Sequence, residues 1–199
     1  MKRFRHWAVA ITAILAVGCA STALTNSWLD PTFTGPPFTK ILVIGWTESP
    51  EVRQQFENTF VEMLKTDGIP AVASYTVMPT MMSKETEAIA EAKRLGDVDG
   101  VIITRVIDVQ QAPAPIPIQP YSSADMALYR NTAPMNPVQM VGQGVAKDYV
   151  LGTDVYQVST GHMVWWGQTT SFDSDNPNRI GWGAASRILT ALRSAKLVH

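Results

Sequence analysis

The sequence predicts an α/β domain, and three features lead to that prediction. Apolar runs typical of buried strands begin at about residues 40 and 99. Two segments with apolar residues at helical spacing lie between these runs. The first segment follows the first run and ends at Gly68, and the second precedes the second run and ends at Gly96. Strands that alternate with helices imply right-handed crossovers, so a parallel core sheet is expected.

The first half of this domain is expected to run strand, helix, strand, helix, strand. The predicted strands span about residues 40–46, 70–77 and 99–109. Ser49 is placed to cap the first helix, with Pro50 at its first position. The second helix is expected to open at Ser83.

The pattern then changes to an irregular segment, residues 110–144. It begins QQAPAPIPIQP, and alternating prolines cannot donate the hydrogen bonds of a central strand. Loops of this length are usually functional or disordered, so a partner-binding role and a flexible insertion both stay open.

Order is expected to resume at about residue 145 with two strands around STGH, where Gly161 supplies the positive φ of a hairpin turn. Asn176 and Pro177 then open a final helix whose apolar stripe can cover one sheet face. The order of elements is therefore βαβαβ, long loop, ββα. We predict one α/β domain, residues 40–198, with a mixed five-stranded sheet.

The N-terminus has the composition of an export signal. Three basic residues within MKRFR precede an apolar run that is too short to span a membrane, which needs about 20 residues. Residues 1–18 are therefore expected to be cleaved.

The stretch LAVGC, which ends at Cys19, resembles the lipobox of bacterial lipoproteins. The resemblance implies that the sulfur of Cys19 carries a diacylglyceryl group and that this residue becomes the mature N-terminus. Ala20, where Asp would favour inner-membrane retention, points to the outer membrane. Residues 19–39 would then be a lipidated tether, and the membrane a partner through the lipid. The alternative is an ordinary signal peptide with a buried cysteine.

Charge and cysteine content exclude several classes of protein. Removal of residues 1–18 leaves 13 of 16 basic residues against 17 acidic ones, a net charge of −4. A chain of this charge is not expected to bind nucleic acid. A single cysteine also allows no intrachain disulfide, so stability must come from packing.

The residues available for chemistry favour a protein without catalysis. Beyond residue 18 only His162 and His199 remain, and no phosphate loop, dinucleotide fingerprint or Gly-x-Ser-x-Gly occurs, so no metal site or cofactor is expected. The alternative is an enzyme or small-ligand site at the carboxyl ends of the parallel strands. Its crevice would be formed by Thr47, Glu48, Ser49 and Asp108.

Aromatic residues favour a binding role instead. Trp165 and Trp166 are adjacent on a predicted strand, so they must point to opposite sheet faces. One can enter the core, and the other is either covered by the last helix or exposed as a protein-binding patch. The loop residues Tyr121, Met126 and Tyr129 are further partner-binding candidates, since they need a cover of some kind.

The segments KILVIG, GDVDGVIITRV and YQVSTGHMVW resemble a group of uncharacterised proteobacterial lipoproteins. Similar strands and hairpins occur in periplasmic lipoprotein domains that activate peptidoglycan synthases or assemble secretion channels. The resemblance implies an envelope accessory protein without catalysis that binds another envelope protein.

Overall fold

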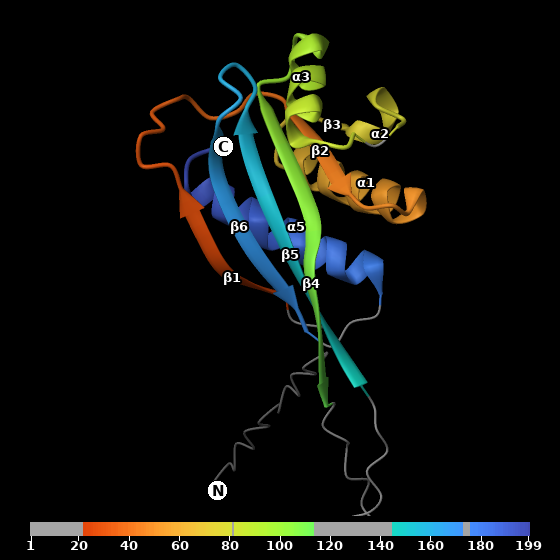
Figure 1. The fold of residues 1–199 in the computed structure, drawn as a ribbon. Coiled ribbons are helices and arrows are strands. Elements are labelled where there is room, and N and C mark those ends of the chain that lie inside the picture. Colours follow the sequence, from red (N-terminus) through yellow and green to blue (C-terminus); the bar gives the residue numbers. More distant parts are fainter. Residues whose placement is uncertain (1–21, 81, 114–144, 173–175) are drawn as a thin grey trace, which may run out of the picture.

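The structure is a computed structural model that describes residues 22–80, 82–113, 145–172 and 176–199. A mixed six-stranded sheet has the order β1-β6-β5-β4-β2-β3 (Figure 1). The strands are β1 (Thr22–Leu29), β2 (Ile41–Trp46), β3 (Ala71–Ala73), β4 (Gly100–Pro113), β5 (Val145–Gln157) and β6 (Met163–Ser171). β2 lies parallel to β3 and β4, whereas the other neighbours are antiparallel. The predicted α/β class with one mixed sheet is confirmed.

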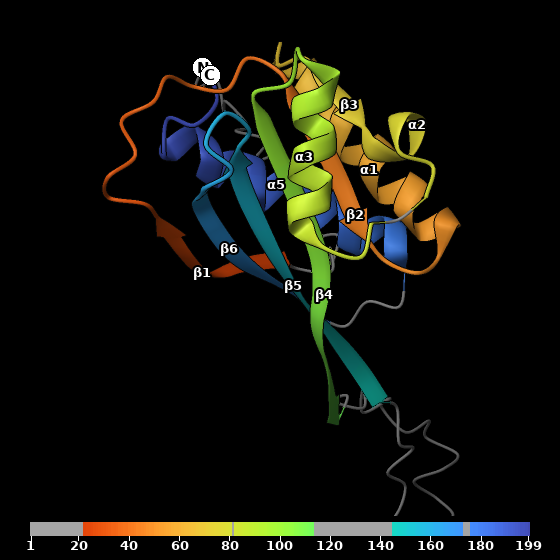
Figure 2. The same ribbon diagram turned by 45° about the horizontal axis from the view of Figure 1, so that its top comes forward.

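The long helices divide between the two faces of the sheet. α1 (Pro50–Thr66) and α5 (Pro177–Ser194) cover one face, which we call the inner face, and the larger buried cluster lies beneath them. α3 (Glu85–Leu95) packs on the outer face against β2 and β4 (Figure 2). The outer side of β1, β6 and β5 therefore has no helix over it among the described residues.

Local signals set several of these ends as expected, but α3 begins at Glu85 with Lys84 at the N-cap position, rather than at Ser83. The hydroxyl of Ser49 accepts a hydrogen bond from the Val52 amide at 3.3 Å, and Asn176 caps α5 in the same way. Gly96, at φ +82°, ends α3, and Gly161, at φ +72°, lies in the turn between β5 and β6.

β1 is the main departure from the sequence prediction. The expected tether, residues 19–39, is wrong for residues 22–29, which pair antiparallel with β6 and add a sixth strand. The segment TALTNSWL lacks a strong strand pattern because it forms the edge of the sheet and most of its residues are exposed. Pairing with β6, rather than local propensity, makes it a strand.

The second predicted strand is shorter than expected. β3 ends at Ala73, and the chain continues into one helical turn, α2 (Ser74–Val77). The buried carboxylate of Glu57 causes this change, because it accepts hydrogen bonds from the Ser74 hydroxyl at 2.6 Å and the Tyr75 amide at 2.8 Å. Hydrogen bonds to a carboxylate of α1 thus end the strand, although the residues that follow have strand propensity.

Candidate functional site

The outer face over β1, β6 and β5, which no described helix covers, carries a patch of large apolar side chains. Trp28, Trp166 and Asp154 are direct neighbours across β1, β6 and β5, so their side chains lie on the same face. Trp28 is 44% exposed, and Trp166 is half-buried. Ile107 and Trp166 both approach the bare Cα of Gly152 from this side. We call Trp28, Trp166 and Ile107 the aromatic patch.

The two adjacent tryptophans point to opposite faces, as expected. Trp165 is only 2% exposed and belongs to the inner buried cluster beneath the helices. Its ring lies across Gly167, where a Cβ atom would stand 2.1 Å from the ring. α5 covers the side of Trp165, so the expected cover for Trp166 by the last helix does not form.

A cluster of charged groups borders the aromatic patch. Arg105 forms ion pairs with Glu85 of α3 and with Asp154, where Nη2 and Oδ2 are 2.9 Å apart. Asp154 is buried, and desolvation raises the pKa of its carboxyl group, while the charge of Arg105 acts in the opposite direction. Burial and the neighbouring Asp154 raise the pKa of Tyr156 to about 12. The cluster is therefore a fixed polar border beside an apolar surface.

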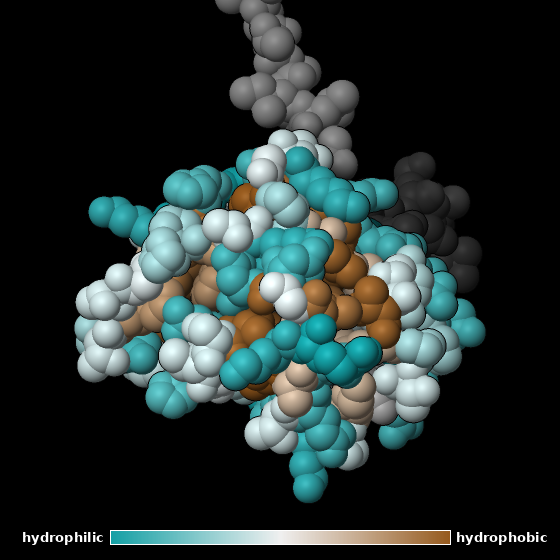
Figure 3. All heavy atoms as spheres, turned by 90° about the horizontal axis from the view of Figure 1, so that it is seen from above, coloured by the Kyte–Doolittle hydropathy of each residue, from teal (hydrophilic) through white to brown (hydrophobic). Residues whose placement is uncertain are grey.

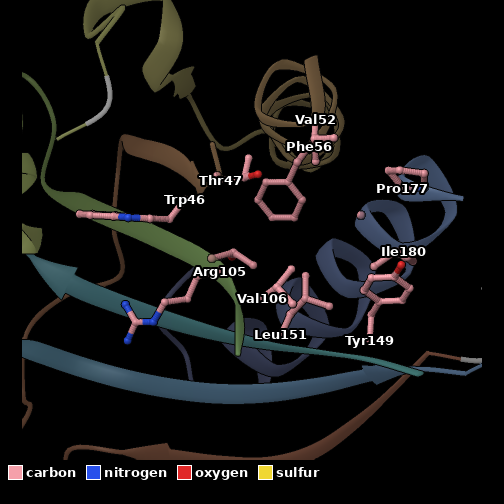
Figure 4. A pocket seen from close by; sticks show the side chains of 13 residues that line it. Trp46, Thr47, Val52, Phe56, Arg105, Val106, Tyr149, Leu151, Pro177 and Ile180 are labelled. Carbon is pink, nitrogen blue, oxygen red and sulfur yellow. The ribbon is translucent and has the colours of Figure 1, made fainter. Parts of the chain in front are cut away.

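A separate cavity of about 210 Å³ lies on the inner face, at the carboxyl end of β2 and the middle of β4. It opens between the first turns of α1 and α5 (Figure 4). Figure 4 shows Phe56, Val106 and Leu151 beside this space, whereas the guanidinium group of Arg105 points away from it. Pockets with largely apolar walls can take small apolar ligands. The lining residues are Gly45, Trp46, Thr47, Val52, Phe56, Thr104, Arg105, Val106, Tyr149, Leu151, Pro177, Ile180 and Gly181.

The four residues of the expected crevice have different surroundings. Thr47 lines the cavity, but Glu48 and Asp108 are exposed and do not line it. Asp108 accepts hydrogen bonds from the Val109 amide and from a neighbouring side chain, and Ser49 caps α1. Among the described residues, the cavity wall therefore includes only Thr47 of the four expected crevice residues.

Cys19, Tyr121, Met126 and Tyr129 lie outside the described residues. Within the described part of the chain, no group of three or more His, Cys, Asp or Glu side chains could hold a metal ion. The helices in that same part include none that is long and apolar enough to cross a membrane. His162, the histidine expected in the hairpin turn, is exposed there.

The sequence does not predict that Trp28 and Ile107 share a surface with Trp166. Trp28 lies in the expected tether, residues 19–39, and Ile107 lies in the strand expected at about residues 99–109. A β-bulge between Val106 and Asp108 shifts the register at Ile107, and no clear sequence signal marks it. Trp28 lies opposite Trp166 only because β1 forms, and β1 forms through tertiary contacts rather than through local sequence propensity.

The described residues form an α/β domain whose outer sheet face carries α3 over β2 and β4 and no helix over β1, β6 and β5. No protein-family model matches the chain, and a search of curated proteins found no match. Among solved structures, the chain is similar to the PelC dodecamer from Paraburkholderia phytofirmans, with a TM-score of 0.46 and 13% identity over 89% of this chain and 99% of that chain. It is also similar to lipoprotein GNA1162 from Neisseria meningitidis, with a TM-score of 0.42 and 9% identity over 78% and 99% of the two chains. The corresponding values for the hypothetical protein CT253 from Chlamydia trachomatis are 0.37, 10%, 79% and 94%.

Proposed function

We propose that the protein is an outer-membrane lipoprotein, anchored through a lipid on Cys19, and that it binds another envelope protein without catalysing a reaction. The anchor is supported by the lipobox-like LAVGC, which holds the only cysteine of the chain. The binding role is supported by one structural observation, the pairing of exposed Trp28 with Trp166 on an uncovered sheet face. Tyr121, Met126 and Tyr129 remain predicted contacts of the same partner.

The composition of this face is typical of a protein interface. Tryptophan side chains frequently supply most of the binding energy at such surfaces, and polar residues surround them. Asn26 and Gln168 occupy the neighbouring cross-strand pair on the same face as the aromatic patch. The partner is therefore expected to cover the tryptophans with apolar groups and to hydrogen bond to the surrounding amides.

The anchor is tested by Cys19→Ser. We expect this variant to lose incorporation of labelled palmitate and to leave the membrane fraction, because the lipid supplies the attachment. Ser21→Ala is the matched control and should keep both properties. Sedimentation of Cys19→Ser with the outer membrane would contradict the proposed anchor.

The binding role is tested by site-specific photocrosslinking in intact cells. A photoreactive residue at position 28 should yield a defined adduct, whereas one at Trp182, which is exposed on α5, should not. Trp166→Ala should weaken the adduct formed at position 28, since it removes the tryptophan that lies directly opposite this position on β6. Equal adducts at positions 28 and 182 would contradict a specific interface.

The cavity favours a second function, the binding of a small apolar ligand. Val106 lines the cavity, and Ile107 lies on the outer face of the same strand. Val106→Trp should therefore reduce the binding of an apolar fluorescent probe, and Ile107→Trp should leave it unchanged. Equal probe binding by both variants would argue against a ligand in this cavity.

A further inference from the structure

One wall of the cavity is held in place by the ring of Phe56. A Cβ atom at Gly45 of β2 would stand 3.1 Å from this ring, and one at Gly181 of α5 would stand 3.3 Å from it. The ring therefore packs against two bare backbone positions, and it also meets the ring of Phe60 edge-on, with 5.9 Å between the centroids. Because these contacts fix Phe56, the space beside it belongs to the folded structure.

Another wall carries an exposed apolar side chain. Val106 lies opposite Leu151 across β4 and β5, on the inner face beneath α1 and α5. Leu151 is only 5% exposed, whereas Val106 is 51% exposed. Figure 3 shows the opposite end of the molecule, where hydrophilic residues stand out from the surface and hydrophobic ones are seen between them. A hydrocarbon group in the cavity would remove the Val106 side chain from water, which favours apolar binding.

The volume of the cavity sets the size of its ligand. An apolar cavity of about 150 Å³ takes benzene, which has six carbons, so a cavity of 210 Å³ corresponds to about eight carbons. The cavity is open between the first turns of α1 and α5 (Figure 4), so a chain can enter with its methyl end first and leave its other end at the opening. The two long acyl chains of a phospholipid exceed this volume.

One of the hydroxyl groups of the cavity wall is free to bind a ligand. Among the described residues, the hydroxyl of Thr104 pairs with that of Thr153 at 2.9 Å, and the Thr47 oxygen accepts a hydrogen bond from the Ser49 amide at 3.3 Å. The hydroxyl of Tyr149, the third residue of this kind in the wall, has no hydrogen-bond partner in the same part of the chain. Figure 4 shows the Tyr149 side chain reaching from β5 toward the first turn of α5. It therefore offers a donor at one side of the opening.

This side of the opening also carries positive charge. Lys147 lies two residues before Tyr149 on β5, so both side chains are on the inner face, about 7 Å apart along the strand. Lys147 is half-buried and forms none of the ion pairs found among the described residues. Arg179 lies in the first turn of α5, which contains no acidic residue, whereas Glu48 and Glu51 lie at the start of α1. A carboxylate beside Tyr149 would therefore meet both a donor and a cation.

We propose that the cavity binds a medium-chain fatty acid, with its chain between Phe56 and Val106 and its carboxylate at Tyr149 and Lys147. This inference rests on the proposed binding of a small apolar ligand and names the class of that ligand. The phenolic hydroxyl donates to the carboxylate, and such charge-assisted hydrogen bonds are stronger than those between neutral groups. An ammonium end would instead face the like charge of Lys147, so the site distinguishes acids from amines of equal chain length.

A photoreactive octanoate tests the site directly. The probe carries a diazirine near its methyl end and is added to the full chain, held in nanodiscs. We expect adducts on peptides that contain Phe56, Val106 or Leu151, because these residues line the cavity. Val106→Trp should abolish the adducts by filling the space, and Ile107→Trp, on the outer face of the same strand, should leave them unchanged.

Unlabelled competitors test the class of ligand. From hexanoate to octanoate, each added CH₂ group should raise the affinity about fourfold, and the gain should stop above about ten carbons, when the cavity is full. Octanoate should compete about tenfold better than octylamine. Tyr149→Phe and Lys147→Gln should each reduce this preference, whereas Lys93→Gln, at an exposed position on α3, should not.

The outcomes separate this inference from the function on which it rests. Adducts in the cavity with equal competition by octanoate and octylamine would overturn the fatty acid and leave a small apolar ligand. An unchanged preference in both Tyr149→Phe and Lys147→Gln, shown to be folded by denaturant unfolding, would also overturn the proposed carboxylate site. Adducts that persist in Val106→Trp, or that form only outside the cavity, would overturn both the fatty acid and the apolar ligand.

Discussion

Arg53 and Glu57 form a buried ion pair one helical turn apart in α1, with 3.0 Å between Nε and Oε1. The Glu57 carboxylate also accepts a hydrogen bond from the Gly45 amide at 3.0 Å, in addition to its bonds from Ser74 and Tyr75. Arg53 in turn donates to the Ser74 hydroxyl at 2.8 Å. The pair therefore connects the end of β2, the first turns of α1 and the turn after β3.

Removal of the charge on Glu57 should destabilise the domain strongly. Glu57→Gln leaves the guanidinium of Arg53 buried without its counter-charge, and breaking a buried pair in this way costs about 3–5 kcal/mol. The free energy of unfolding, measured with denaturant, checks this expectation. Glu62→Gln lies on the same helix at an exposed position and should change stability by less than about 0.5 kcal/mol. Equal effects of the two substitutions would show that the ion pair is not a main support of the fold.

Asp154 should make stability depend on pH in the direction opposite to that of most carboxylates. Burial raises the pKa of its carboxyl group in the folded state, so the folded protein binds this proton more tightly than the unfolded chain does. The raised pKa of Asp154 therefore stabilises the folded state fully at pH values below the pKa of the unfolded chain, which is near 3.9. This stabilisation is lost as the pH rises through the higher pKa of the folded state.

The matched variant for this effect is Asp154→Asn, which cannot titrate. We expect the difference in unfolding free energy between the natural protein and Asp154→Asn to move in favour of the natural protein as pH falls from 7 to 4. Denaturant unfolding at several pH values measures this difference. A constant difference over that range would mean that Asp154 has an ordinary pKa.

Two glycines of α5 should respond differently to alanine. A Cβ at Gly183 would stand 2.1 Å from the hydroxyl oxygen of Thr22, whereas one at Gly181 would stand 3.3 Å from the ring of Phe56. Alanine raises helix propensity by about 1 kcal/mol at either position. Gly183→Ala should nevertheless destabilise the domain by about 1–3 kcal/mol, because it overpacks the contact between α5 and β1.

The measurement for these glycines is hydrogen exchange of β1 together with denaturant unfolding. Gly183→Ala should speed exchange at residues 22–29, and Gly181→Ala should leave that exchange unchanged. Slow exchange of β1 in Gly183→Ala would show that α5 can shift to make room for the methyl group.

The fold was predictable where local signals are strong. The apolar runs of β2 and β4, the caps at Ser49 and Asn176, and the positive φ of Gly161 each depend on residues close in sequence. β1 was not predictable in this way, because its pairing with β6 joins residues about 140 positions apart. The aromatic patch depends on that pairing, so only one of its three residues, Trp166, could be proposed from the sequence.

The last prediction concerns the segment between β4 and β5. Loop closure changes stability by only about 0.6 kcal/mol for each doubling of loop length. Replacement of residues 114–144 by a short Gly/Ser linker should therefore leave the domain folded, with a denaturant midpoint close to that of the natural protein. The ladder of β4 and β5 includes residues 110–113 and 145–148, so a control replacement of residues 110–148 removes four strand pairs and should destabilise the domain.

If residues 114–144 contact the proposed partner, the first variant should also lose the crosslinked adduct at position 28. A folded variant that keeps this adduct would place the whole interface on the sheet, and unfolding of the first variant would show that the segment supports the core.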